Sequence, residues 1–467
     1  MNLAEWLPDQ TSTSGGLNQA QNVLPRVDGY GPLQSLQTLS TALPAAFKGG
    51  GAFIATNGTS TLLVGTATGL VQYAAGAWTS IVSGLTITDD WRFVQFGNNV
   101  VAVNGSVTKA INLTTGVATT LAGAPTGKSV AVVGDYVVIG QDTSDLLKIS
   151  TSAFNDYTGW TPGVAQSTVQ PMLTGGEVMG LAGGEYGVIL QRQRLVRMSR
   201  TGDGLAPFQY DQITDNVGCA CKASVAAEGR SVFFLSDRGF MALENGQQLV
   251  PIGSEKIDRT FQAAVPRDDY ERMFSAVDPQ NKLVIWCIPG LAGSLWIYNF
   301  ELNRWAYGAL PIDGIFSGFT SSQTLEQVSA TYPNLDTMPY SLDDPRFQGG
   351  SPRLYGVSGG LLGTFTGANL AALFETSFSQ DTPGRKSRYR QLRPITDATA
   401  GMALSVDCRD RLGDVPNVTV AGPLRVSGAM PIRTYGRYAK LTWSIAAATT
   451  WSFAQGYEAQ FEAGGER

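Results

Sequence analysis

The sequence contains no histidine in 467 residues. Histidine is the side chain whose ordinary pKa lies in the physiological range, and it is also the most common metal ligand. Its absence excludes Ser-His-Asp and Cys-His catalysis and most zinc sites. Catalysis based on carboxylates alone or on lysine survives this first test.

Cysteine is scarce as well, with Cys219, Cys221, Cys287 and Cys408 as the only four. The Cys-Ala-Cys pair has the wrong spacing for a zinc knuckle or a thioredoxin-type motif, and no second pair follows it. We therefore expect buried, reduced thiols, which is the usual state in a reducing cytoplasm.

Charge and long apolar runs are also limited. Charged residues make up 15% of the chain and the formal net charge is −5. The chain thus lacks the basic surplus that drives tight, non-specific nucleic-acid binding, although an acidic wall suits a channel that DNA must leave. No stretch reaches the roughly 20 apolar residues of a membrane span, and the N-terminus lacks the pattern of a signal peptide. We expect a protein without a membrane span.

Glycine and short apolar runs are abundant, with 55 glycines in the chain. From residue 52 the runs recur at spacings of roughly 40 to 50 residues, with three or four strand-length segments in each unit. This pattern predicts an all-β fold, a β-propeller of six or seven blades. Six units span residues 52–79, 91–111, 129–139, 178–198, 224–243 and 273–306, and residues 352–366 would supply a further strand pair that closes the ring.

The rest of the chain divides around this propeller. Residues 1–51 are polar and turn-rich, which predicts an extended N-terminal arm with isolated apolar anchors. Residues 52–370 form the expected propeller, and residues 371–467 a small C-terminal β-sandwich-like domain. Within the propeller, residues 254–272 have helical periodicity, and residues 321–348 are typical of a long loop.

The candidate contact residues form one basic stretch. On a strand, Arg388 and Arg390 share a face, which Lys386 joins after a gap, while Ser387 and Tyr389 lie on the other. In an acidic protein such cations usually meet acidic partners, so an exposed strand face or a salt-bridged contact with a neighbouring subunit is favoured over contact with DNA phosphates in a lumen. The predicted contact residues are Arg385, Lys386, Arg388, Arg390 and Arg393.

Two patterns invite an enzymatic interpretation. The segment Ser236-Asp237-Arg238-Gly239-Phe240 resembles the Asp-box of sialidase-type propellers, but ordinary turn chemistry favours a simple hairpin turn. Adjacent carboxylates on a strand point to opposite faces, the wrong geometry for a glycosidase pair. We therefore expect no enzyme, with no catalytic, cofactor-binding or metal residues. The adjacent pairs are Asp89-Asp90, Asp268-Asp269 and Asp343-Asp344.

Several segments together resemble the tail-hub, or nozzle, proteins of short-tailed bacteriophages, a family also known as packaged-DNA stabilisation proteins. Residues 22–33 (NVLPRVDGYGPL) are similar to the family's opening, in which an apolar-Pro stretch leads into a Gly-Tyr segment. Residues 186–243 are similar to its middle blades, and Gly253-Ser254-Glu255-Lys256-Ile257-Asp258-Arg259 to the short helix that follows them.

The resemblance implies a structural virion protein of the phage tail, assembled in the host cytoplasm. It implies a homohexameric ring below the portal and the head-to-tail adaptor, to which tail fibres or a tail needle attach. Double-stranded DNA would pass through the lumen without sequence-specific binding. The alternative from another class is a propeller glycan-binding protein or carbohydrate-active enzyme, with carboxylates and aromatic side chains that converge at the propeller axis.

Overall fold

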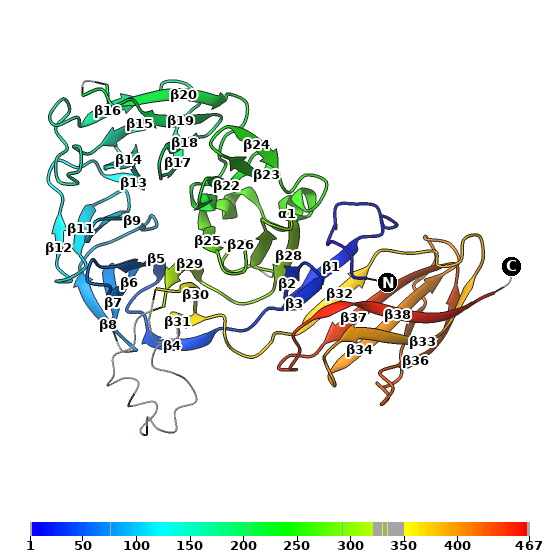
Figure 1. Ribbon diagram of the computed structural model, residues 1–467. Coiled ribbons are helices and arrows are strands. Elements are labelled where there is room, and N and C mark those ends of the chain that lie inside the picture. Colours follow the sequence, from blue (N-terminus) through cyan, green and yellow to red (C-terminus); the bar gives the residue numbers. More distant parts are fainter. Residues whose placement is uncertain are drawn as a thin grey trace.

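A computed structural model describes residues 2–464, except residues 75, 205 and 292 and the segment 321–349, in which only residues 329 and 334 are described. The long loop predicted over residues 321–348 and the pair Asp343-Asp344 therefore lie outside the described residues. The expected all-β propeller with a C-terminal β domain is confirmed (Figure 1).

The described residues form seven four-stranded antiparallel blades arranged in a ring (Figure 1). The first three blades follow one another along the chain. They are β5 (Phe47–Ile54), β6 (Ser60–Thr66), β7 (Gly69–Ala74) and β8 (Ala77–Val82); β9 (Arg92–Phe96), β10 (Asn99–Val103), β11 (Thr108–Asn112) and β12 (Ala118–Thr120); and β13 (Gly127–Val133), β14 (Tyr136–Asp142), β15 (Asp145–Thr151) and β16 (Thr168–Pro171).

The next three blades continue around the ring, and the sixth belongs to a larger sheet. They are β17 (Val178–Ala182), β18 (Gly187–Gln191), β19 (Leu195–Arg200) and β20 (Phe208–Thr214); β21 (Ala226–Glu228), β22 (Ser231–Ser236), β23 (Gly239–Glu244) and β24 (Gln248–Pro251); and β25 (Phe274–Asp278), β26 (Leu283–Cys287), β27 (Leu295–Asn299) and β28 (Arg304–Gly308).

Stacking of blades explains why their strands are apolar on both faces. In β10, Val100 packs in a cluster with the first blade, whereas the next residue, Val101, packs with Val137 and Ile139 of the third. Both valines are fully buried. Since successive strand residues point to opposite faces, each blade fills two cores at once.

The seventh blade closes the ring with a strand from the N-terminal segment. It consists of β29 (Gly314–Phe319), β30 (Pro352–Ser358) and β31 (Leu361–Thr364), and β4 (Gln37–Ala42) is its outermost strand. The register pairs Leu361 with Ala42 and Thr364 with Gln37. On the inner side β29 lies against β5. A strand of the segment assigned to the arm thus completes the propeller, and it removes an exposed sheet edge.

The C-terminal domain is a sandwich of two sheets. One contains β32 (Ala372–Thr376), β37 (Tyr438–Ile445), β34 (Met402–Arg409) and β35 (Val418–Val420). The other contains β38 (Ala454–Ala463), β33 (Ser387–Thr396) and β36 (Met430–Gly436), extended by the hairpin of β2 (Val23–Arg26) and β3 (Gly29–Pro32). Phe374, Leu392, Leu404, Ile432 and Trp443 fill the space between them.

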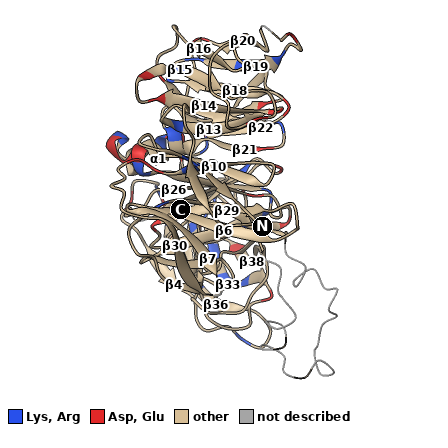
Figure 2. Cartoon of the chain, turned by 90° about the vertical axis from the view of Figure 1, so that its left-hand side faces the viewer, with Lys and Arg blue, Asp and Glu red and all other residues tan. Residues whose placement is uncertain are grey.

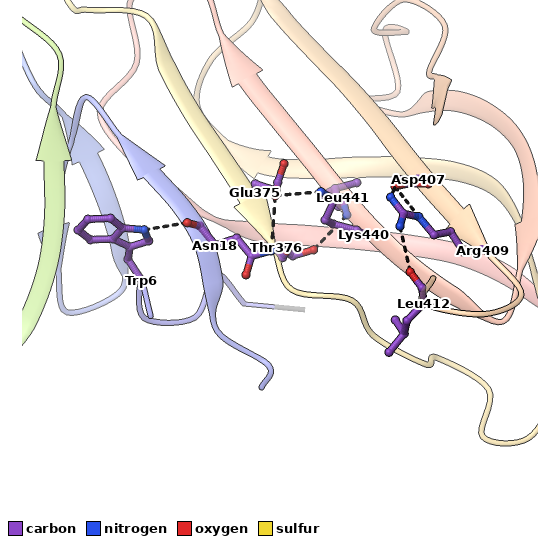
Figure 3. Close-up of polar contacts among 9 residues, drawn as sticks. All are labelled: Trp6, Asn18, Glu375, Thr376, Asp407, Arg409, Leu412, Lys440 and Leu441. Atoms are coloured by element: carbon purple, nitrogen blue, oxygen red, sulfur yellow. Dashed lines mark hydrogen bonds and ion pairs between the residues drawn. The ribbon is translucent and has the colours of Figure 1, made fainter. Parts of the chain in front are cut away.

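The N-terminal segment joins the sandwich to the propeller. Its strand β1 (Leu17–Gln21) lies between β28 of the sixth blade and β32, so one nine-stranded sheet runs through both domains. Trp6 is 2% exposed and stacks on Tyr307 with ring centroids 5.2 Å apart. Its Nε1 donates to the Asn18 carbonyl at 2.9 Å. From there polar contacts continue through Glu375 and Thr376 into the sandwich (Figure 3).

The helix predicted over residues 254–272 is wrong in its length. The structure has α1 (Asp258–Ala264) and a separate 3₁₀ turn (Arg267–Arg272), divided by Val265 in an extended conformation. Proline disfavours helical geometry in the residue before it, and Pro266 follows Val265, so the helix ends there.

The arm also caps this helix from 250 residues away. The Asp9 carboxylate accepts hydrogen bonds from the Arg259 and Thr260 amides at 2.7 and 2.8 Å. An acceptor at a helix start satisfies amides that lack partners inside the helix. Nearby, Asp258 is buried and accepts a hydrogen bond from the Phe240 amide at 3.0 Å. The pKa of Asp258 is raised to about 6, mainly by burial. The hydrogen bond from the Phe240 amide lowers this pKa, and the negative charge of Asp9 raises it.

This pKa predicts a pH-dependent cost in stability. Below pH ~4 the Asp258 carboxyl is protonated in both the folded and the unfolded chain, whereas between pH ~4 and ~6 the unfolded chain loses the proton first. The stability that Asp258 contributes is therefore lost as the pH rises through 6. We expect Asp258→Asn to be more stable than the wild type by up to about 3 kcal/mol at pH 7, and by much less at pH 4. Urea unfolding at both pH values measures this, and an equal difference at both would contradict it.

Candidate interaction surface

The basic stretch lies on β33, where the side chains alternate between solvent and core. Arg388, Arg390 and Arg393 are exposed, while Tyr389 and Leu392 are buried in the sandwich. A bulge between Tyr389 and Gln391 shifts the register, so Arg393 is exposed although it is an odd number of residues from Arg390. Lys386 and the exposed Arg385 precede the strand.

Predicted contact residues form ion pairs within the domain. Lys386 meets Asp410 at 2.7 Å, Arg390 meets Glu462 at 2.7 Å, and Arg393 meets Glu458 at 3.4 Å. Exposed pairs of this kind contribute little to stability, about 0 to 1 kcal/mol each. They leave the cations accessible to other partners. Arg388 has no ion pair among the described residues.

A groove of about 720 Å³ runs beside these arginines. Arg388 and Arg390 line it from β33, Arg433 from β36, and Arg425 from the loop between β35 and β36. The Gly422 amide donates to the Pro431 carbonyl at 2.7 Å, which holds this loop against β36. Arg388, Arg425 and Arg433 have no ion pair with any described residue, so the groove favours an anionic partner.

Exposed apolar side chains lie on the groove and on the segments that line it. Val420 lines the groove and is 71% exposed, and Tyr435, which pairs with Arg388, is 63% exposed. Val418 of β35 and Val426, next to Arg425, are also exposed. In addition β35 and β36 are the last strands of their sheets among the described residues. Arginine, tyrosine and apolar side chains together are typical of protein interfaces. We call this surface the sandwich edge; it comprises Arg388, Arg390, Arg425, Arg433, Val418, Val420, Val426 and Tyr435.

Sequence reasoning found Arg388 and Arg390 but missed Arg425, Arg433 and the valines. One signal was available, because residues 415–437 contain three arginines and no acidic residue in an acidic protein. Their position beside β33 was not available, since it depends on the pairing of β33 with β36, whose paired residues are 38 to 49 positions apart in the chain.

The mouth of the propeller axis contains a second group of charges. Asp89, before the second blade, meets Lys128 of the third at 3.0 Å and Lys222, before the fifth, at 2.6 Å. Burial raises the pKa of Asp89, but the two lysines outweigh it and hold the pKa below its usual value. Asp90 instead faces Lys48 at 3.8 Å, and burial raises its pKa. The two adjacent carboxylates thus have different partners.

A cavity of about 400 Å³ opens at this mouth, between Lys48, Asp90, Arg272, Phe274 and Asp313. Because the Asp89–Lys222 pair joins blades that are three apart in the ring, side chains cross the axis here. The axis of one propeller is therefore bridged by ion pairs and is not an open duct at this end.

The remaining candidates have structural roles in the described part of the chain. The predicted turn at residues 236–239 is confirmed: Ser236 Oγ donates to the Gly239 carbonyl at 2.8 Å and accepts from the Arg238 amide at 3.1 Å. Asp237 forms ion pairs with Arg192 and Arg267. Asp268 and Asp269 lie in the 3₁₀ turn after α1.

All four cysteines are buried and unpaired, as expected. Burial raises the pKa of the Cys219 thiol to about 12 and that of the Cys221 and Cys408 thiols to about 11. Among the described residues no cluster of three or more potential ligands is placed to bind a metal ion. No described helix has the length and apolar character to cross a membrane.

Comparison with known proteins shows no family for this chain. No protein-family model and no curated protein matches the chain. An extracellular domain assigned to a one component system of B. thetaiotaomicron has a TM-score of 0.42 at 9% identity, over 84% of this chain and 45% of that one. PorZ, a surface component of the type-IX secretion system of Porphyromonas gingivalis, has a TM-score of 0.36 at 13% identity, over 73% of this chain and 44% of that one. The dihydro-heme d1 dehydrogenase NirN has a TM-score of 0.37 at 12% identity, over 87% of this chain and 79% of that one. The chain thus spans less than half the length of the first two.

Proposed function

We propose that this protein is a non-enzymatic structural subunit that assembles with copies of itself into the tail hub, or nozzle, of a short-tailed bacteriophage. The observation that carries the assembly role is the sandwich edge. There, apolar side chains lie together with three arginines and two sheet edges that have no partner among the described residues. Such a surface is typical of protein contacts. The specific assembly, a phage tail, rests on the resemblance in residues 22–33, 186–243 and 253–259.

Two further features support a mechanical role. The nine-stranded sheet and the buried Trp6 join the propeller firmly to the sandwich, which suits a subunit that bears load. The ion pairs of Asp89 bridge the propeller axis, so DNA would leave through a lumen between subunits and not through one propeller. In this proposal the ring sits below the portal and adaptor in the virion, and fibres or a needle bind its outer surfaces.

The mass of the assembled protein tests the proposal. Six copies of the 49.6 kDa chain would weigh about 300 kDa. We expect a ring of this order by native mass spectrometry and electron microscopy, either for the chain alone or after co-expression with the proteins encoded beside it. A chain that stays monomeric under both conditions, and that binds or cleaves glycans through the cavity beside Asp90, would support the glycan-binding alternative instead.

A further inference from the structure

A second exposed apolar surface lies on the outer edge of the third blade. Its strand β16 ends its sheet among the described residues, so one side of its backbone has no partner strand there. In Figure 1 this blade lies at the upper left, at the opposite end of the molecule from the sandwich. We call this surface the blade edge; its exposed apolar side chains are Leu146, Phe154, Val164, Val169 and Leu173.

The uncompensated charges near the two edges have opposite signs. At the blade edge, Lys148 and Arg200 are paired with Asp142 and Asp135, while the exposed Asp145 and Asp156 have no ion pair among the described residues. The loop and strands of residues 415–437 contain three arginines and no acid. The difference extends to whole domains. Residues 371–467 have 12 basic and nine acidic residues, a net charge of +3, and residues 1–370 have 21 and 29, a net charge of −8. Figure 2 shows the side of the ring that carries β15 and β16, where residues other than Lys, Arg, Asp and Glu (tan) make up most of the chain.

From this complementarity we propose that the sandwich edge of one copy docks on the blade edge of the next copy, head to tail. The inference rests on the proposed ring and names its contact surfaces. Contacts between two different surfaces of identical chains propagate in one direction and close into a ring when the rotation permits. Burial of valine, leucine and tyrosine side chains supplies the attraction, and the arginines select the acidic partner and its orientation.

The composition of the sandwich edge favours this occupant over DNA. Binding of phosphates requires cations, but it gives no reason for Val418, Val420 and Tyr435 to be exposed beside them. A second copy offers both an apolar contact and acidic charge for Arg388, Arg425 and Arg433, which have no ion pair among the described residues.

One variant at each edge tests the contact. The sandwich-edge variant is Arg388→Glu with Arg433→Glu, which breaks no ion pair among the described residues. The blade-edge variant is Val169→Ser with Leu173→Ser, which removes apolar side chains and adds no cation that the glutamates of the other variant could bind. Arg238→Glu, at an exposed turn of the fifth blade, and Val117→Ser, on an exposed position of the second, are the matched controls. Circular dichroism and thermal unfolding verify that each variant folds.

We expect each edge variant to associate about 100-fold more weakly than the wild type and to remain near 50 kDa, while both controls retain the ring mass. Mixing the two edge variants gives the decisive result, because each still carries one intact edge. The mixture should form a one-to-one dimer of about 100 kDa and no ring. The measurement is native mass spectrometry under the conditions in which the wild type assembles.

The other outcomes overturn the inference, and they are distinguishable from failure of the proposed function. Edge variants that keep the ring mass would leave the tail-hub proposal standing and place its contacts elsewhere. The same result with weaker retention of DNA would assign the arginines to the lumen. Folded edge variants that stay monomeric on mixing would exclude a head-to-tail contact. A wild-type chain that never assembles would remove the proposed function itself.

Discussion

Replacing Trp6 by alanine is expected to lower the free energy of unfolding by about 3–5 kcal/mol, the usual cost of deleting a buried tryptophan. Trp6 is 2% exposed and packs on Tyr307 and Trp296 of the sixth blade, while its Nε1 donates to Asn18 of β1. The variant would leave a cavity between the propeller and the strand that joins it to the sandwich. Equilibrium unfolding in guanidinium chloride measures the loss.

The same variant should also uncouple the domains. With the β1 segment loosened, we expect two unfolding transitions where the wild type has one, and faster proteolysis near residues 7–16. Tyr435→Ala is the control, since Tyr435 is an exposed aromatic residue outside the junction and should change stability by less than about 0.5 kcal/mol. A Trp6→Ala variant as stable as this control would contradict the role of the arm as a structural connector.

Gly183→Ala is expected to cost about 3 kcal/mol, because two blades approach each other through their backbones at this residue. A Cβ atom on Gly183 would lie 2.1 Å from the Val132 carbonyl oxygen of β13. The neighbouring Gly184 amide donates to that same oxygen at 2.9 Å, so the backbone cannot retreat without breaking an inter-blade hydrogen bond. Thermal unfolding would show the loss as a drop of several degrees in Tm.

Gly413→Ala is the matched control for this prediction. An added Cβ there has no neighbour within 4 Å, and no left-handed backbone conformation requires glycine. Its Tm should match that of the wild type. Equal Tm values for the two alanine variants would mean that the third and fourth blades are not packed as closely as their backbone contact requires.

The two charged regions, the ion pairs at the propeller axis and the arginines of the sandwich edge, have different roles. At the axis, Asp89 is neutralised by Lys128 and Lys222, so these charges hold blades together. At the sandwich edge, Arg388, Arg425 and Arg433 have no such partner among the described residues. Charges that a fold leaves exposed, uncompensated and beside apolar side chains are available for partners. The surfaces available for partners are therefore at the outer edges of the molecule and not at the propeller axis.

Much of the architecture could be predicted from local sequence. Repeated strand-length apolar runs with glycine turns indicate blades, because a blade buries both faces and so needs apolar residues at consecutive positions, as Val100 and Val101 show. The turn at residues 236–239 and the alternation around Arg388 and Arg390 were likewise readable, since both depend only on neighbours in the chain. The predicted helix over residues 254–272 was too long, because Pro266 ends the helix at Ala264.

The sequence by itself determined the all-β class, the exclusion of histidine chemistry and the basic stretch, because each follows from composition or short-range periodicity. Only the tertiary structure decided that β4 closes the seventh blade, that Trp6 joins the domains and that Arg425 and Arg433 stand beside Arg388. These facts depend on pairings between residues tens to hundreds of positions apart. Such pairings are selected by global packing and strand register, which no local pattern encodes.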